Sequence, residues 1–375
     1  MPYDTHSKDA DIMKISVIGA AGGIGQCLSL LLMSQLTGSL LDGSQFPSKR
    51  IHFALYDINV DAINGLVADL SHINTPVTVS GYSPCEKDSL KKCLSNCHLV
   101  IIVAGIPRKL GMTREDLLET NVEIMSHCAN SIAEFCDLSK VFILVISNPI
   151  NILVPVLVEQ LSRFSEGKHF DIRRRVFGIT NLDSVRSSAF LHKLMVDTHK
   201  LVRPNMMPTV PVIGGHSGTT ILPLFSLASP SVSLSTNETK CLVHHVQYGG
   251  DEIVKAKKGM GSATMSMAHA AKEIVFDFIE LLIGTKNIIE GSYYVSLIDD
   301  SGEPLFPSAA KLLRLIDNCP YFAIPCSISR EEGTNSVDYK IIYEMDSYEH
   351  ENMLPDCLSG LKDTLEMAKN IRSGI

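Results

Sequence analysis

Four short runs of strand-forming residues recur along the first half of the chain. They occupy 14–20, 51–58, 99–106 and 141–149, and each is apolar over most of its length. Continuous apolar runs, without alternation, are typical of strands buried on both faces of a parallel sheet. The pattern therefore predicts a parallel sheet in this half.

Longer segments with helical spacing of apolar residues separate these runs. They lie at 23–36, 59–71, 115–136 and 150–163. Strands and helices in alternation indicate an α/β fold with a doubly wound sheet, in which helices cover both faces.

The composition changes around 164–177, where the chain becomes polar and basic. We expect a domain boundary there, with an N-terminal extension at 1–13, a first domain at 14–177 and a second at 178–375. The second half mixes long helical patterns with strands, which predicts an α+β domain. Its expected elements are a strand at 208–213 and helices at 182–194, 238–258, 262–284 and 351–372.

Composition and charge exclude some function classes. The 375 residues carry a formal net charge of −8, and a principal nucleic-acid partner usually needs a basic face, so none is expected. No apolar run approaches the roughly 18 residues that cross a bilayer, so no membrane partner is expected. The first fourteen residues lack the apolar core of a signal peptide and contain three aspartates but no arginine. We expect a cytoplasmic location, with a mitochondrial or peroxisome-like compartment left open.

The cysteines indicate reduced thiols, because the chain has ten of them and no secretory signal. Cys93, Cys97 and His98 lie close together, but a metal cage needs a second ligand pair at suitable spacing. No such pair follows in the sequence. We therefore expect structural thiols and no metal.

A glycine cluster separates the first apolar run from the helical segment after it. Gly19, Gly22 and Gly25 form a G-x-x-G-x-x-G series. Glycine suits a tight turn from strand to helix, and it allows a ligand to approach the backbone closely. The amides at the helix start then face a pyrophosphate, as in dinucleotide-binding sheets of the Rossmann type. Taken alone, the series fits a simple glycine-rich turn equally well.

Asp57 strengthens the dinucleotide interpretation. It ends the next apolar run, where a carboxylate accepts hydrogen bonds from the adenosine ribose hydroxyls. The same charge repels a 2′-phosphate, which favours NAD over NADP. Asp57 lies 32 residues beyond Gly25, longer than usual, and we attribute the difference to an inserted loop at 37–50.

Three residues of the second half suit hydride transfer at a carbonyl, which needs a proton donor beside the reacting carbon. His216 follows an apolar run and two glycines, and histidine exchanges protons near neutral pH. Asp183 and Arg186 share one face of a helix, so Asp183 can orient an imidazole while Arg186 grips a carboxylate. The alternatives are a structural histidine and an exposed ion pair.

Two strand ends in the first half carry further polar residues, at the edge where open sheets bind ligands. Arg108 and Arg114 lie six residues apart in a loop, which suggests a second carboxylate and a polarised carbonyl oxygen as their partners. Asn148 can hydrogen-bond the nicotinamide ribose region and the substrate. The alternatives are a solvated basic loop and an Asn-Pro pair that merely ends a strand.

The order of these motifs resembles that of the malate dehydrogenases, in the branch with a G-x-x-G-x-x-G turn that occurs in bacteria and mitochondria. The resemblance covers about 14–290 and thins beyond that. The matching motifs are GAAGGIGQ, LYDI, DLSH, VAGIPRKLGMTREDL, SNPIN, LDSVR, VPVIGGHSG and GSATMSMAHAA. The chain resembles a divergent member, with a Rossmann-type sheet followed by an α+β substrate domain.

The resemblance implies reversible hydride transfer between malate and NAD, giving oxaloacetate and NADH, a reaction of the tricarboxylic acid cycle. By the same resemblance, His216 is the proton donor and acceptor, and Asp183 is its partner. Arg186 binds the carboxylate next to the reacting carbon.

The remaining roles are also implied by the resemblance. Arg108 binds the distal carboxylate, Arg114 polarises the carbonyl, and Asn148 contacts both the dicarboxylate substrate and the cofactor. A homodimer or homotetramer is implied. The cofactor positions are Gly19, Gly22, Gly23, Ile24, Gly25, Asp57, Asn121 and Met267.

Several departures from the family pattern keep two alternatives open. Leu110 replaces the usual proline of the arginine loop, Glu123 stands where a small residue is common, and 195–207 is lengthened. One alternative is a dehydrogenase for another 2-hydroxy acid, such as an aromatic one, and the presence of Arg108 argues against it. The other is a non-catalytic NAD-binding relative, against which the intact His216 argues.

Overall fold

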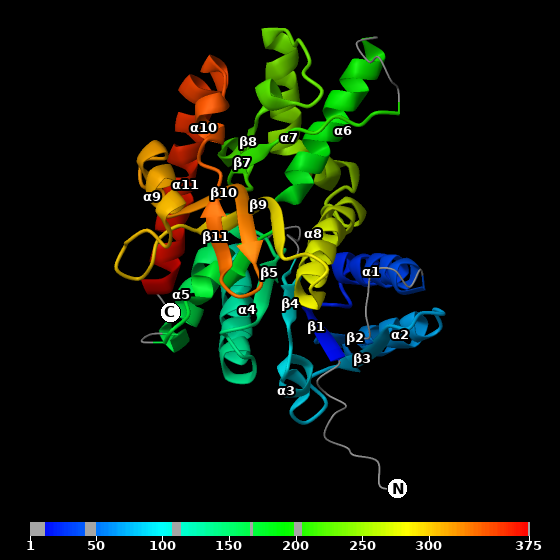
Figure 1. The fold of residues 1–375 in the computed structure, drawn as a ribbon. Coiled ribbons are helices and arrows are strands. Elements are labelled where there is room, and N and C mark those ends of the chain that lie inside the picture. Colours follow the sequence, from blue (N-terminus) through cyan, green and yellow to red (C-terminus); the bar gives the residue numbers. More distant parts are fainter. Residues whose placement is uncertain (1–11, 42–49, 107–113, 166–167, 199–204, 374–375) are drawn as a thin grey trace, which may run out of the picture.

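A single mixed sheet runs through the whole molecule, with helices packed on both of its faces (Figure 1). The computed structural model describes residues 12–41, 50–106, 114–165, 168–198 and 205–373. Within these ranges the sheet has eleven strands, in the order β3-β2-β1-β4-β5-β6-β9-β10-β7-β8, and β11 pairs with β10.

The first six strands are parallel and confirm the predicted doubly wound sheet. Their order, β3-β2-β1-β4-β5-β6, reverses direction between β1 and β4, which is where such sheets bind ligands. The strands are β1 (Ile12–Ile18), β2 (Arg50–Tyr56), β3 (Thr78–Tyr82), β4 (Leu99–Ile102), β5 (Phe142–Val145) and β6 (Val176–Gly178). The helices are α1 (Gly23–Leu41), α2 (Val60–Ser71), α3 (Ser89–Leu94), α4 (Arg114–Phe135) and α5 (Ile150–Ser165).

The second half continues the same sheet and confirms the predicted α+β character. Gly178 at the end of β6 pairs antiparallel with Tyr294 of β9, and the remaining strands follow from there. The strands are β7 (Val212–Gly214), β8 (Ile221–Pro223), β9 (Ile288–Ser296), β10 (Tyr321–Ser329) and β11 (Gly333–Val337). The α-helices are α6 (Asn181–Asp197), α7 (Thr236–Ala256), α8 (Met265–Ile283), α9 (Pro307–Leu315), α10 (Ile341–Glu344) and α11 (Leu354–Ser373).

Burial explains why the central strands were readable from the sequence. Every residue of β4 and β5 is buried, so both faces of each strand are apolar and no alternation appears. β3 has no fully buried position and β6 has only three residues, so neither produced a continuous apolar run.

Some predicted boundaries are wrong. The predicted strands 99–106 and 141–149 end at Ile102 and Val145, because the chain turns there toward the ligand-binding edge. The predicted loop 37–50 is helical at its start, since α1 continues to Leu41. Its residues 42–49 lie outside the described part. The predicted domain boundaries stay a prediction.

Two of the thiols that the sequence singled out lie in the hydrophobic core. Cys93 and Cys97 are buried, and the Cys93 Sγ donates to the carbonyl of Ala54 at 3.4 Å. Burial raises the pKa of the Cys93 thiol to about 12, which keeps it protonated and unreactive. Among the described residues, no group of His, Cys, Asp and Glu side chains is arranged to hold a metal ion.

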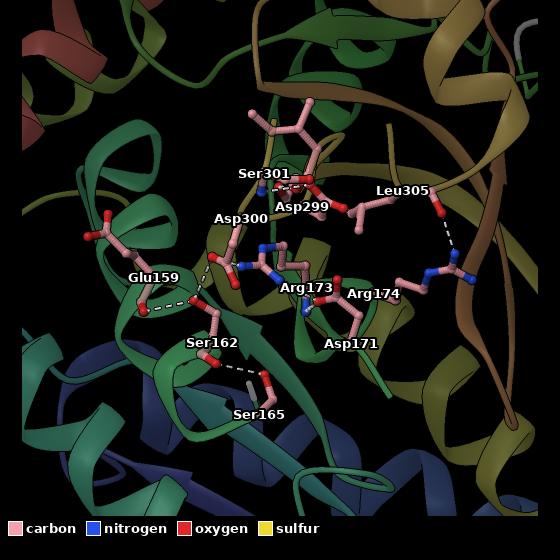
Figure 2. Close-up of polar contacts among 12 residues, drawn as sticks. Glu159, Ser162, Ser165, Asp171, Arg173, Arg174, Asp299, Asp300, Ser301 and Leu305 are labelled. Atoms are coloured by element: carbon pink, nitrogen blue, oxygen red, sulfur yellow. Dashed lines mark hydrogen bonds and ion pairs between the residues drawn. The ribbon is translucent and has the colours of Figure 1, made fainter. Parts of the chain in front are cut away.

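Ion pairs and hydrogen bonds of Arg173 and Arg174 connect the segment after α5 with the loop after β9 (Figure 2). Arg173 is 7% exposed and forms ion pairs with Asp171, at 2.9 Å, and with Asp300. Asp300 also accepts a hydrogen bond from Ser162 at 3.3 Å, and Arg174 donates to the carbonyl of Leu305. The network borders a polar cavity of about 730 Å³. Because Arg173 is already paired on both sides, we interpret the network as structural.

Candidate active site

A second cavity, of about 700 Å³, lies at the carboxyl ends of the strands and is lined by both halves of the chain. The glycine turn contributes Ile24 and the exit of β5 contributes Asn148. The second half contributes α6, the turn after β7, α7 and α8. Six predicted site residues line it: Ile24, Asn148, Asp183, Arg186, His216 and Met267.

His216 and Asp183 form a directed pair in this cavity. The Nδ1 of His216 lies 2.6 Å from Oδ2 of Asp183, which is completely buried in the first turn of α6. The positive end of the helix dipole stabilises a carboxylate at that position. An imidazole that donates from Nδ1 to Asp183 keeps Nε2 for proton exchange with a ligand.

Asp183 also holds Arg186. Its Oδ1 accepts from Nη1 of Arg186 at 3.3 Å, so one carboxylate orders both the imidazole and the guanidinium. The Arg186 side chain is only 12% exposed and lines the cavity. The alternative interpretation of Asp183 and Arg186 as an ion pair on the exposed helix surface is therefore wrong.

Two glycines of α7 lie against this guanidinium. A Cβ at Gly249 would lie 3.4 Å from Cδ and Nε of Arg186, and one at Gly250 would lie 3.9 Å from Nη2, which are ordinary van der Waals distances. Helix α7 therefore covers the Arg186 side chain and forms one wall of the cavity.

The glycine turn passes very close to the neighbouring main chain at two positions. Gly19 has a φ of +88°, and a Cβ there would lie 2.5 Å from Cα of Ala104. A Cβ at Gly25 would lie 2.5 Å from the carbonyl oxygen of Ala20. Only glycine fits either position, since the turn must pass close to the exit of β4 and then enter α1.

Asp57 lies beside this turn, at the carboxyl end of β2. Its Oδ2 accepts from the amide of Ala21 at 2.9 Å, and its Oδ1 accepts from the amide of Asn59 at 3.0 Å. The carboxylate is partly exposed and its neighbour Ile58 is 78% exposed. A ribose can reach the carboxylate, and the apolar Ile58 offers a surface for an aromatic base.

Asn121 links two strand ends from the middle of α4. It is 3% exposed, and its Oδ1 accepts from the amide of Ile106 at 2.9 Å. Its Nδ2 donates to the carbonyl of Asn148 at 3.2 Å. Asn121 thus holds the exits of β4 and β5 together beside the glycine turn.

Parts of the predicted arginine loop fall outside the described residues. Arg108 and Leu110 lie there entirely, and the structure gives Arg114 only its main-chain place at the start of α4. Their contacts with substrate stay predictions.

Sequence reasoning missed several residues that line or support the cavity. Asn151, the last residue of SNPIN, accepts a hydrogen bond from the amide of His216, a contact between residues 65 apart. Helix α7 presents Gln247, Tyr248 and Asp251 to the cavity. Gly249 and Gly250 could have indicated that this part of α7 lies at the site, since glycine inside a helical pattern usually has a packing or functional reason.

Two family models match nearly the whole chain. The lactate/malate dehydrogenase NAD binding domain matches residues 13–171, and the lactate/malate dehydrogenase alpha/beta C-terminal domain matches residues 180–371. The chain belongs to the lactate/malate dehydrogenase family. The family resemblance of the motifs is confirmed, and so are the Rossmann-type NAD-binding half and the α/β half after it.

Individual relatives agree with this family assignment. The chain is 50% identical to the cytoplasmic malate dehydrogenase of Saccharomyces cerevisiae over 377 residues, covering 100% of this chain and 97% of the relative. It is 35% identical to the mitochondrial malate dehydrogenase of Sus scrofa, covering 96% and 93%.

Solved structures of family members share the fold. The malate dehydrogenase from Picrophilus torridus in its apo form superposes with a TM-score of 0.73 at 20% identity, covering 96% of this chain and 99% of that one. The lactate dehydrogenase from Cryptosporidium parvum, complexed with lactic acid and nicotinamide adenine dinucleotide, gives 0.67 at 20% identity, covering 96% and 98%. In the part of the chain that the structure describes, no helix is long and apolar enough to cross a bilayer.

Proposed function

We infer that this chain is an NAD-dependent malate dehydrogenase, which interconverts malate and oxaloacetate. The observation that carries the inference is the buried Asp183 carboxylate, which holds His216 at 2.6 Å and Arg186 at 3.3 Å in one cavity. A proton donor and a carboxylate-binding cation therefore stand side by side. The full-length match to malate dehydrogenases supports the same reaction.

The described residues fit NAD. Glycine at positions 19 and 25 lets the turn pass against Ala104 and Ala20 and enter α1, whose first main-chain amides suit a pyrophosphate. Asp57 stands where the ribose hydroxyls would bind, and Met267 lines the cavity near the turn. Bound NADH supplies the hydride for reduction of the keto carbon.

The chain's own residues bind the substrate and move the proton. Arg186 binds the carboxylate next to the keto carbon through paired hydrogen bonds. Nε2 of protonated His216 gives its proton to the carbonyl oxygen, and Asp183 stabilises the imidazolium before transfer. In malate oxidation, neutral His216 accepts the hydroxyl proton.

The substrate is a four-carbon dicarboxylate, with Arg108 on the distal carboxylate and Arg114 on the carbonyl oxygen. A monocarboxylate would leave Arg108 desolvated and unpaired, which costs several kcal/mol. We further propose that the protein forms a homo-oligomer and works in the cytoplasm. The 50% identity to a relative named as cytoplasmic supports this location.

A substrate comparison tests the proposal. With NADH as cofactor, kcat/KM for oxaloacetate is expected to exceed that for pyruvate and phenylpyruvate by at least about 100-fold, because only oxaloacetate pairs every arginine. Steady-state initial rates measure it. A tenfold preference for either monocarboxylate contradicts the malate assignment. Tight NADH binding without turnover of any 2-keto acid indicates the non-catalytic relative.

Asp57 is expected to set the preference for NADH over NADPH. Replacing it with serine should raise KM for NADH about tenfold, because the ribose loses a charged acceptor, and should raise kcat/KM for NADPH as the repulsion disappears. Asp61→Ser removes an exposed carboxylate four residues further on and serves as the control. An unchanged NADH/NADPH ratio in Asp57→Ser contradicts the assignment.

A further inference from the structure

Asn151, in the first turn of α5, is a buried amide that contacts the turn carrying His216. The residue is 1% exposed. Its Oδ1 accepts from the main-chain amide of His216 at 2.9 Å. Its Nδ2 donates to Oγ of Ser217 at 3.0 Å and to Oγ1 of Thr220 at 3.2 Å. Three hydrogen bonds therefore join one side chain of the first half to three residues of the turn in the second half that carries His216.

The turn itself is closed by Thr220. The Thr220 hydroxyl donates to the carbonyl of Ser217 at 2.7 Å and accepts from the Ser217 amide at 3.0 Å. The Thr220 carbonyl accepts from the amide of Gly215 at 2.8 Å. The main chain on both sides of His216 is therefore bonded into one small unit, and Asn151 joins that unit to α5.

The packing around this contact is tight. A Cβ at Gly215 would lie 2.6 Å from Oγ1 of Thr220 and 2.8 Å from Nδ2 of Asn151. The glycine before His216 thus gives the Asn151 amide its access to the turn. A larger residue there would displace the amide or the hydroxyl.

His216 is consequently held at two points. Asp183 orients the imidazole through Nδ1, and Asn151 fixes the main chain from which the ring projects. Without the Asn151 contact, the imidazole could still bind Asp183, but its Nε2 would no longer have a fixed position in the cavity. Proton transfer requires that position to hold within a fraction of an ångström.

Asn151 also connects the His216 turn to the strand ends on the cofactor side of the cavity. It follows Asn148 by three residues, and the Asn148 carbonyl accepts from Nδ2 of Asn121. Asn121 in turn binds the amide of Ile106 at the exit of β4. The exits of β4 and β5 and the His216 turn are therefore joined by two buried side-chain amides.

We propose that Asn151 is a positioning residue for the reaction, which sets the main chain of His216 so that its Nε2 meets the substrate carbonyl. The proposal rests on the inferred role of His216 as proton donor. It predicts that loss of the Asn151 amide lowers turnover without weakening cofactor binding, because the hydrogen bonds that the structure describes for Asn151 reach the His216 turn and Tyr294 and not the glycine turn.

The test compares Asn151→Ala and Asn151→Asp with the wild type. Asn151→Ala is expected to lower kcat for oxaloacetate reduction roughly 10- to 100-fold, while Kd for NADH, measured by fluorescence, stays within about twofold. Asn151→Asp keeps an acceptor for the His216 amide, and the Ser217 hydroxyl can turn to donate to it, while the Thr220 hydroxyl stays bonded to the Ser217 carbonyl. We expect the logarithm of kcat for Asn151→Asp to lie at least about halfway between those of Asn151→Ala and the wild type.

The pH profile gives a readout that a purely structural role would not move. The carboxylate of Asn151→Asp lies beside the His216 turn and favours the imidazolium, so the kcat/KM profile should shift to higher pH. If Asn151→Ala does not fold, the shift of the pH profile in Asn151→Asp alone tests the proposal. Val158→Ala, which truncates a buried residue two turns along α5, is the matched control and should lose stability but keep kcat.

Several results would overturn the proposal. One is an Asn151→Ala variant whose kcat stays within twofold of wild type. Another is an equal loss of kcat in Asn151→Ala and Val158→Ala. A third is an Asn151→Asp variant whose pH profile of kcat/KM matches that of the wild type. A wild-type protein without oxaloacetate turnover contradicts the proposed function instead. Wild-type turnover that His216→Asn abolishes and Asn151→Ala leaves intact contradicts only the role of Asn151.

Discussion

Replacing His216 with asparagine is expected to lower kcat for oxaloacetate reduction by roughly 10²- to 10⁴-fold, the usual contribution of a positioned general acid. Asparagine fills similar space and can still donate a hydrogen bond to Asp183, but it has no group that can give a proton to the substrate at neutral pH. Kd for NADH should stay within about twofold, since the glycine turn and Asp57 are untouched. Stopped-flow or steady-state absorbance of NADH, together with fluorescence titration, measures both quantities.

A histidine elsewhere on the surface provides the control for this substitution. His269 lies on α8 two residues from Met267 and is exposed. His269→Asn should therefore keep wild-type kcat. Wild-type turnover in His216→Asn would show that another group transfers the proton.

Replacing Arg186 with glutamine is expected to lower kcat/KM for oxaloacetate by roughly 10²- to 10³-fold. The substrate carboxylate loses its paired hydrogen bonds, and truncating one partner of a buried charge pair costs about 2–5 kcal/mol. Arg186→Lys keeps the charge but not the planar fork, so an intermediate loss is expected. NADH binding should not change.

Loss of Arg186 also affects Asp183, which would keep His216 as its remaining side-chain partner among the contacts described. Thermal unfolding therefore accompanies the kinetic measurement, to separate lost stability from lost substrate binding. Arg163→Gln removes an arginine with a 69% exposed side chain on α5 and is the matched control. Equal kcat/KM in Arg186→Gln and Arg163→Gln would contradict the assignment of Arg186.

The fold class could be predicted because the strands that carry it are buried on both faces. β4 and β5 have no exposed residue, so their sequences are continuous apolar runs. The ligand-binding edge followed from the same argument, since polar residues after parallel strands meet at one end of the sheet. The family prediction is confirmed, and it rested on motifs at this edge.

The internal arrangement of the site could not be predicted from spacing. An i, i+3 spacing brings Asp183 and Arg186 onto one face of α6, but it does not say what covers that face. The covering helix α7 comes about 60 residues later, and only the folded structure places it over Arg186. The contact of Asn151 with His216 likewise depends on how β7 returns to α5.

The single sheet has a mechanical consequence for the cavity. β6 and β9 are joined at Gly178, where a Cβ would lie 2.7 Å from Cγ2 of Ile150 on α5 and 3.0 Å from Cβ of Tyr294. A hinge between the two halves would have to break this junction and leave unpaired strand edges on both sides. The strand that leads into the glycine turn, β1, and the strand that leads into His216, β7, are therefore parts of one hydrogen-bonded sheet, and the strand pairing between them sets their spacing when the chain folds.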